Sequence, residues 1–126
     1  MQNYRCCFAV IILALTGCVQ KTYKKTVICN LNVAAVKNIK TVGVRGEGKP
    51  LSWGIDLPLK EVVKDSLYTI TLPVKTGYKF IELKFTVNES FELENENNRR
   101  ILFSDGDTTV YNAVFNKMPS PTSSQQ

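Results

Sequence analysis

Hydrophobic and polar residues alternate along most of the chain between residues 26 and 117. A period of two is typical of a β-strand that buries one face, because successive side chains point to opposite sides of the strand. The strands predicted in this way span residues 27–33, 39–45, 67–72, 78–87, 91–94, 99–103 and 108–115. No stretch of about ten residues keeps a helical period, and the nearest candidate, 57–63, contains Pro58.

About seven short strands separated by turn residues predict an all-β domain, an antiparallel immunoglobulin-like β-sandwich. Val27, Cys29 and Leu31 alternate with Ile28 and Asn30 and should face its core. The residues expected on one face of strand 78–87 are Lys79, Ile81, Leu83, Phe85 and Val87. Pro73 should end the strand before it, since proline donates no ladder hydrogen bond. The segment 104–107 should form a hairpin turn between 99–103 and 108–115.

The N-terminal residues have the layout of a secretory signal peptide, with a positively charged start that includes Arg5 and a short apolar run. The run is too short to span a bilayer and ends in the sequence Leu-Thr-Gly-Cys at residues 15–18. This ending resembles a bacterial lipobox, which implies cleavage before Cys18 and lipidation of that cysteine. The alternative is an ordinary signal peptide in which Cys18 has no special role.

These features divide the chain into four parts. Residues 1–17 are the predicted lipoprotein signal peptide and 18–25 the lipidated cysteine with its tether, followed by the folded domain at 26–117 and a disordered tail at 118–126. Acyl chains on Cys18 would anchor the protein to the membrane of a bacterial envelope. Val19 carries no obvious signal for retention in the inner membrane, which favours the outer membrane.

The chain is moderately basic, with 16 basic and 11 acidic residues and a net charge of +5. Much of the excess lies in the tether, at Lys21, Lys24 and Lys25. Attraction to anionic lipid headgroups explains lysines beside a lipid anchor. A nucleic-acid partner is not expected, because it would require a clustered basic face on the folded domain.

Histidine is absent from the chain, and this excludes several kinds of site. Catalytic triads with histidine and metal sites with histidine ligands cannot form. Of the four cysteines, Cys6 and Cys7 lie in the signal peptide and Cys18 would be acylated, so Cys29 has no intramolecular partner. We therefore expect a buried Cys29 thiol, no disulfide framework, no metal and no cofactor.

Two features could carry chemistry. Trp53, the only tryptophan, follows a glycine-rich turn and could offer a flat face for stacking on a sugar, or it could plug one end of the sandwich. Glu92 and Glu94 lie two residues apart on a predicted strand, opposite Phe91 and Leu93. Paired carboxylates suit glycoside hydrolysis, with Asp56 as a further candidate, but a solvated surface is the interpretation that we favour for the glutamates.

Several segments, in order, resemble the starch-binding domains of glucoamylases and related amylases. They are the segments 42–46 (Val-Gly-Val-Arg-Gly), 51–53 (Leu-Ser-Trp), 68–73 (Tyr-Thr-Ile-Thr-Leu-Pro), 82–85 (Glu-Leu-Lys-Phe), 91–94 (Phe-Glu-Leu-Glu) and 98–99 (Asn-Arg). Together they cover most of the predicted domain. No single segment is specific, but their order and spacing follow the family.

The resemblance implies a sugar-binding site. Trp53 matches the first of two stacking tryptophans, and Lys84 and Asn98 match the lysine and asparagine that bind hydroxyl groups. Outside this match, we add Glu94 as a fourth residue expected to bind hydroxyl groups. The second tryptophan falls at Leu93, which has no aromatic face, and the neighbouring Phe91 is expected to be buried.

The function expected is a lipid-anchored, non-catalytic module that holds α-glucan, such as starch or maltooligosaccharide, at the bacterial envelope. The alternative is a structural or protein-interaction lipoprotein with the same fold, a lost sugar site and an envelope protein as its partner. A small glycosidase is a third hypothesis, which we rank last because the mature chain leaves little material for a deep cleft.

Overall fold

The computed structural model describes residues 21–119, which form strands, turns and loops without a helix in that range. The strands are β1 (Tyr23–Asn32), β2 (Val42–Gly46), β3 (Leu57–Pro58), β4 (Lys60–Val63), β5 (Leu67–Thr76), β6 (Phe80–Val87), β7 (Ser90–Phe91), β8 (Arg99–Leu102) and β9 (Thr108–Val114). The all-β prediction is confirmed. The described part of the chain has nine strands rather than about seven.

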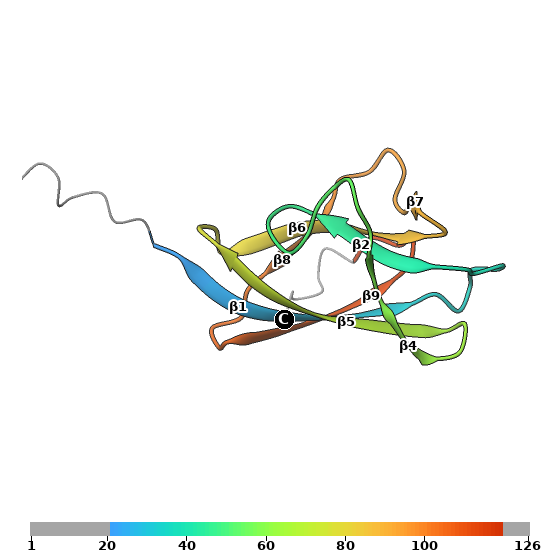
Figure 1. The fold of residues 1–126 in the computed structure, drawn as a ribbon, viewed down its shortest axis with the longest axis horizontal. Helices are drawn as coiled ribbons and strands as arrows, with labels where there is room; N and C mark the ends of the chain where they lie inside the picture. The colour runs from blue at the N-terminus through green and yellow to red at the C-terminus, as the bar shows by residue number, and fades with distance from the viewer. Residues whose placement is uncertain (1–20, 120–126) are drawn as a thin grey trace, which may run out of the picture.

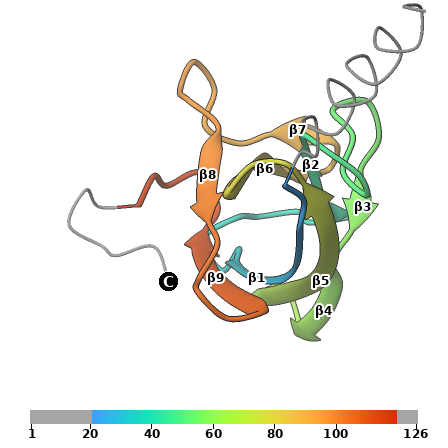
Figure 2. The ribbon, with the colours of Figure 1, turned by 90° about the vertical axis from the view of Figure 1, so that its left-hand side faces the viewer.

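The strands form two sheets that lie over one another (Figure 1). The four-stranded sheet has the order β4-β5-β1-β9. The five-stranded sheet has the order β3-β2-β6-β7, and β8 also pairs with β6. Figure 2 shows the sheets end on, with β6 and β2 opposite β1 and β5.

The core lies between the two sheets and confirms the predicted alternation. Cys29 and Leu31 of β1 and Phe85 of β6 are all fully buried in it. Burial raises the pKa of the Cys29 thiol to about 12, although the charge of Arg99 acts in the opposite direction. Cys29 is therefore the buried, unreactive thiol expected from the sequence.

The sheets are not purely antiparallel, which corrects one prediction. β1 pairs with β5 antiparallel but with β9 parallel. The predicted hairpin over 104–107 is also wrong, because β8 pairs with β6 in one sheet and β9 with β1 in the other. Ser104 still closes a local turn, with its amide donating to Thr109 Oγ1 at 2.8 Å. Turn chemistry alone did not decide which strands pair.

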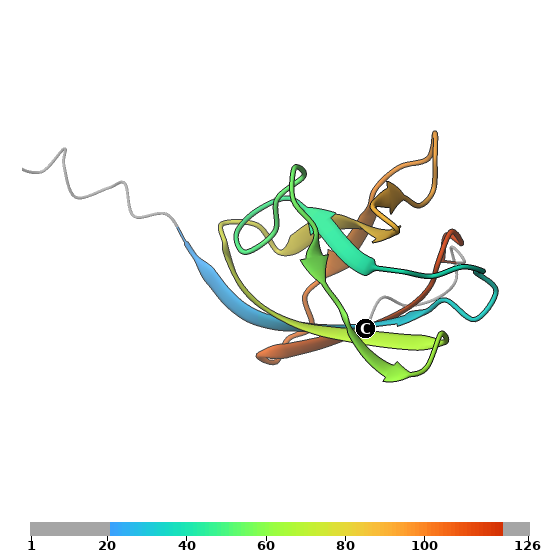
Figure 3. The same ribbon diagram turned by 45° about the vertical axis from the view of Figure 1, so that its right-hand side comes forward.

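The segment 57–63 is neither a helix nor a single strand. It passes from β3 in one sheet to β4 in the other (Figure 3). Leu59 lies at the crossing, where it is buried and its amide donates to the Val42 carbonyl oxygen at 2.9 Å. Because Pro58 precedes Leu59 in a short edge strand, it interrupts no central ladder.

Two strand ends differ from the predictions. β1 begins at Tyr23, so the last three residues of the predicted tether 18–25 belong to a strand. β5 continues through Pro73 to Thr76. Proline is tolerated there because β4 pairs with β5 only between Leu67 and Thr69, which leaves β5 as an edge at Pro73.

The predicted signal peptide 1–17, Cys18 and residues 120–126 of the predicted tail lie outside the described residues. Within residues 21–119, no helix has the length and hydrophobicity needed to cross a bilayer.

Candidate functional site

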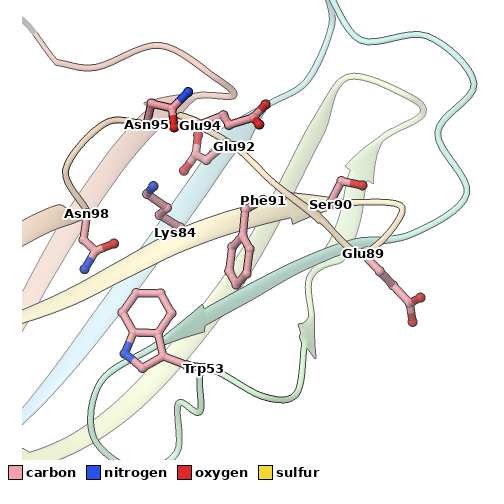
Figure 4. Close-up of a pocket in the computed structure, with 9 residues that line it drawn as sticks. All are labelled: Trp53, Lys84, Glu89, Ser90, Phe91, Glu92, Glu94, Asn95 and Asn98. Atoms are coloured by element: carbon pink, nitrogen blue, oxygen red, sulfur yellow. The ribbon is translucent and has the colours of Figure 1, made fainter.

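An open cleft of about 640 Å³ lies on the face of the five-stranded sheet that points away from the core. Its lining comprises Trp53, Lys84, Glu89, Ser90, Phe91, Glu92, Glu94, Asn95 and Asn98. The four binding residues expected from the sequence, Trp53, Lys84, Glu94 and Asn98, all line this one cleft (Figure 4). They come from β6 and from the loops that follow β2 and β7.

Trp53 is held at the cleft by its own loop. Leu51 anchors this loop in the core, and Trp53 itself is half-buried outside the core. The indole Nε1–H donates to Glu47 Oε2 at 2.9 Å, which sets the orientation of the ring. The interpretation of Trp53 as a plug at one end of the sandwich is wrong, because Trp53 is neither in the core nor among the side chains packed against it, whereas Leu51 of the same loop is buried in the core.

Phe91 reaches the cleft because of the turn before it. Asn88 and Glu89 both have left-handed backbone conformations, with φ of 53° and 66°, as a two-residue type I′ hairpin turn requires. This turn places Phe91 opposite Thr86, two residues along β6 from Lys84 and hence on the same face. Phe91 is 45% exposed, so its predicted burial is wrong.

The two aromatic rings form a pair. The Trp53 and Phe91 ring centroids are 6.2 Å apart and the rings are inclined by 55°. The Arg45 guanidinium lies 5.2 Å from the Phe91 centroid. Arg45 Nε donates to Asp56 Oδ1 at 2.6 Å, and Arg45 Nη1 donates to the Trp53 carbonyl oxygen at 3.4 Å. These contacts hold the pair in place and occupy Asp56.

Glu92 is fully buried and cannot share a solvated surface with Glu94, which corrects the prediction for this pair. Arg99 binds both oxygens of Glu92, through Nε at 2.7 Å and Nη2 at 2.8 Å. The backbone amides of Phe85 and Asn116 each donate to Glu92 at 2.9 Å. Burial lowers the pKa of Arg99, but its hydrogen bond to Glu92 and the charge of Glu92 outweigh this and raise it.

The loop 92–98 replaces most of the predicted strand 91–94. Leu93 and Asn95 have left-handed φ values of 53° and 64°, and Leu93 is 1% exposed. Lys84 Nζ donates to the carbonyl oxygens of Leu93 and Glu96, both at 2.9 Å. Lys84 therefore ties the loop to β6 with two of its three ammonium protons.

The exposed side chains of this loop point outward with their polar groups available. Glu94 and Asn98 are exposed, and their side chains make no hydrogen bond within residues 21–119. The cleft thus combines two apolar ring faces with a carboxylate, an amide and an ammonium group (Figure 4). In the described part of the chain, no group of three or more His, Cys, Asp or Glu residues could hold a metal ion.

Sequence reasoning missed Phe91, Glu47, Arg45 and the buried pair of Glu92 with Arg99. The dipeptide Asn88-Glu89 between two alternating segments was the available hairpin signal, and its register would have turned Phe91 outward. The partners of Glu92 had no local signal, since the Asn116 amide comes from a distant part of the chain.

No protein-family model matches this chain, and a search of curated proteins finds no match.

Proposed function

We propose that this protein is a lipid-anchored, non-catalytic carbohydrate-binding module that holds α-glucan at the bacterial envelope. The observation that carries this proposal is the tilted pair of Trp53 and Phe91 in an open cleft. Sugar rings have apolar C–H faces that stack on aromatic side chains, and the two rings of this pair offer two such faces to one ligand.

The polar rim of the cleft supplies the second half of sugar recognition. Glu94 accepts hydrogen bonds, the Asn98 amide donates and accepts, and Lys84 has one ammonium proton left for a ligand. Sugar hydroxyls both donate and accept, so they match this set. Such groups give orientation, while the ring faces give contact area.

The resemblance to starch-binding domains supports the same proposal, with one substitution of roles. That family stacks its ligand between two tryptophans, and the second falls at the buried Leu93 in this chain. Phe91, two residues earlier, supplies the second ring instead. We extend the proposal to the fold, with the two sheets forming the immunoglobulin-like β-sandwich of that family.

We propose a non-catalytic role because the carboxylates in and near the cleft are bound to other protein groups or point away from one another. Glu92 accepts hydrogen bonds from Arg99 and two backbone amides, Asp56 is bound to Arg45, and Glu47 accepts the hydrogen bond of the Trp53 indole. Glu89 lines the cleft but points away from Glu94 in Figure 4. Hydrolysis of a glycosidic bond requires two carboxyl groups on either side of it, and this arrangement does not offer them.

The anchor belongs to the same proposal. β1 begins at Tyr23, five residues after Cys18, so the domain sits close to the predicted lipid. Lys24 lies opposite Lys75 on the neighbouring strand, and Lys25 is beside them, which places positive charge at this end of the sheet. Anionic headgroups would attract that charge. Mass spectrometry of the N-terminal peptide should show acyl chains that Cys18→Ser removes, and an unmodified Cys18 would contradict the anchor.

The alternative function is that of a structural or protein-interaction lipoprotein whose sugar site is lost. Tryptophan and arginine are enriched in the hot spots of protein interfaces, and Trp53 and Arg45 lie together here beside Phe91. The experiment below separates the two functions.

Titration of the full chain with maltotriose tests the proposal, in a detergent whose headgroup is not a sugar. Trp53 is the only tryptophan, so its fluorescence reports on the cleft alone. We expect a saturable change, and Phe91→Ala should weaken binding about fivefold, since a stacked aromatic contact contributes about 1 kcal/mol. Val110→Ala, an exposed apolar residue on the four-stranded sheet, should leave binding unchanged.

A fluorescence signal that millimolar sugar does not change, from a Trp53 that a neutral quencher reaches, would reject glucan binding. That result would favour the protein-interaction function.

A further inference from the structure

A second aromatic pair lies at the other end of the same sheet face. Tyr78 precedes β6 and is 66% exposed, and its ring centroid lies 5.6 Å from that of Phe80, with the rings inclined by 36°. Arg100 of β8 places its guanidinium 4.0 Å from the Phe80 centroid. The Tyr78 amide donates to Thr76 Oγ1 at 3.2 Å, which fixes the turn that presents the tyrosine.

This pair opens on a cavity of about 450 Å³ that Glu47 and Glu82 also line. Glu47 connects the cavity with the cleft already described, because its carboxylate accepts the hydrogen bond from the indole of Trp53. Its backbone amide donates to the Glu82 carbonyl oxygen at 3.0 Å, so Glu47 is held beside β6. Glu47 therefore lies between the two aromatic pairs and belongs to the surroundings of both.

The outward side chains of β6 run from one pair to the other. Phe80, Glu82, Lys84 and Thr86 alternate with the core residues of this strand, and Thr86 lies opposite Phe91. Phe80 and Thr86 are six positions apart along β6, a distance of about 20 Å. This length exceeds a trisaccharide and suits a longer oligosaccharide.

We infer that the two aromatic pairs are the ends of one binding strip, along which a single glycan chain lies over β6. The inference rests on the proposed function and adds a second site, with Tyr78 and Phe80 as its stacking faces. Glu82 and Arg100, whose Oε2 and Nη2 atoms are 3.5 Å apart, are partly exposed and would bind hydroxyl groups between the platforms. A chain that spans both pairs is bound more tightly than one that reaches only one pair.

Calorimetric titration of the full chain with maltotriose and with maltoheptaose tests this strip, again in a detergent without a sugar headgroup. We expect maltoheptaose to bind at least about fivefold more tightly than maltotriose, as one further stacked ring implies. Tyr78→Ala should remove this preference, whereas maltotriose titration followed by Trp53 fluorescence should keep its midpoint, because that signal reports on the first cleft. Tyr78→Phe, the matched control that keeps the ring, should retain the preference. Unchanged melting by circular dichroism would show that each variant is folded.

The outcomes separate the two proposals. Equal affinity for both sugars in the unmodified protein, or a preference that survives Tyr78→Ala, would overturn the strip and leave the cleft at Trp53 in place. Binding of neither sugar would overturn both proposals. Loss of maltotriose binding in a folded Tyr78→Ala protein would also overturn the strip, because it would place the trisaccharide at Tyr78 and not at Trp53.

Discussion

Replacing Glu92 by alanine should destabilise the protein severely, because it removes one half of a buried ion pair. The side chains of Arg99 and Glu92 are 1% and 0% exposed. Without the carboxylate, the Arg99 guanidinium keeps only neutral partners, which are the Tyr111 hydroxyl and the carbonyl oxygens of Val114 and Lys117. Breaking a buried pair in this way costs about 3–5 kcal/mol.

The magnitude follows from what is left behind. The alanine substitution leaves the buried charge of Arg99 without a counter-charge. It also removes the acceptor of two backbone amides, each of which costs about 1–3 kcal/mol when it stays buried without a partner. Water that enters the space will form hydrogen bonds with some of these groups. We therefore expect the free energy of unfolding to fall by about 3–5 kcal/mol in total. Domains of this size are stable by only about 5–15 kcal/mol, so the substitution should remove a large part of the free energy of unfolding.

Urea unfolding of the full chain at pH 7, followed by circular dichroism, measures this effect. Glu94→Ala is the matched control, since the neighbouring glutamate is exposed and should change the free energy of unfolding by less than about 0.5 kcal/mol. Replacing both members, Glu92→Leu with Arg99→Leu, should recover part of the loss, because no unpaired charge remains although the amides of Phe85 and Asn116 still lack their acceptor. A loss below about 1 kcal/mol in Glu92→Ala would refute the reasoning.

Three further predictions concern the fold. Burial raises the pKa of Cys29 to about 12, so at pH 8 iodoacetamide should label its peptide only after unfolding; labelling of the native protein would contradict its burial. Gly46→Ala should cost about 1–3 kcal/mol in urea unfolding, because its Cβ would lie 2.5 Å from the Glu82 carbonyl oxygen, whereas Gly106→Ala, with nothing within 4 Å, should be neutral. Burial is the main cause that raises the pKa of Tyr68 from 10.0 to about 12, and its hydrogen bond to Glu61 is the second cause. As the pH rises, the Tyr68 hydroxyl therefore loses its proton in the unfolded chain before it does so in the folded protein. The free energy of unfolding should fall between pH 10 and 12, and it should fall less in Tyr68→Phe.

The candidate site was predictable where it depended on residue type and order. Trp53, Lys84, Glu94 and Asn98 were chosen from the sequence, and all four line one cleft. Phe91 and Glu92 were assigned to the wrong faces, because a one-residue change of register exchanges the two faces of a strand. The turn at Asn88 and Glu89, and not the alternation of residues 91–94, decides that register.

The positions and inward faces of most strands were readable from the chain because they depend on local alternation. Cys29 and Leu31 in β1 and Phe85 in β6 needed no knowledge of their neighbours to be placed in a core. Strand pairing depends on distant partners and is decided only when the whole core packs. The parallel pairing of β1 with β9, the crossing between β8 and β9, and the burial of Glu92 against Arg99 are therefore properties of the tertiary structure. A buried carboxylate looks like a surface residue in a sequence until its guanidinium partner is seen beside it.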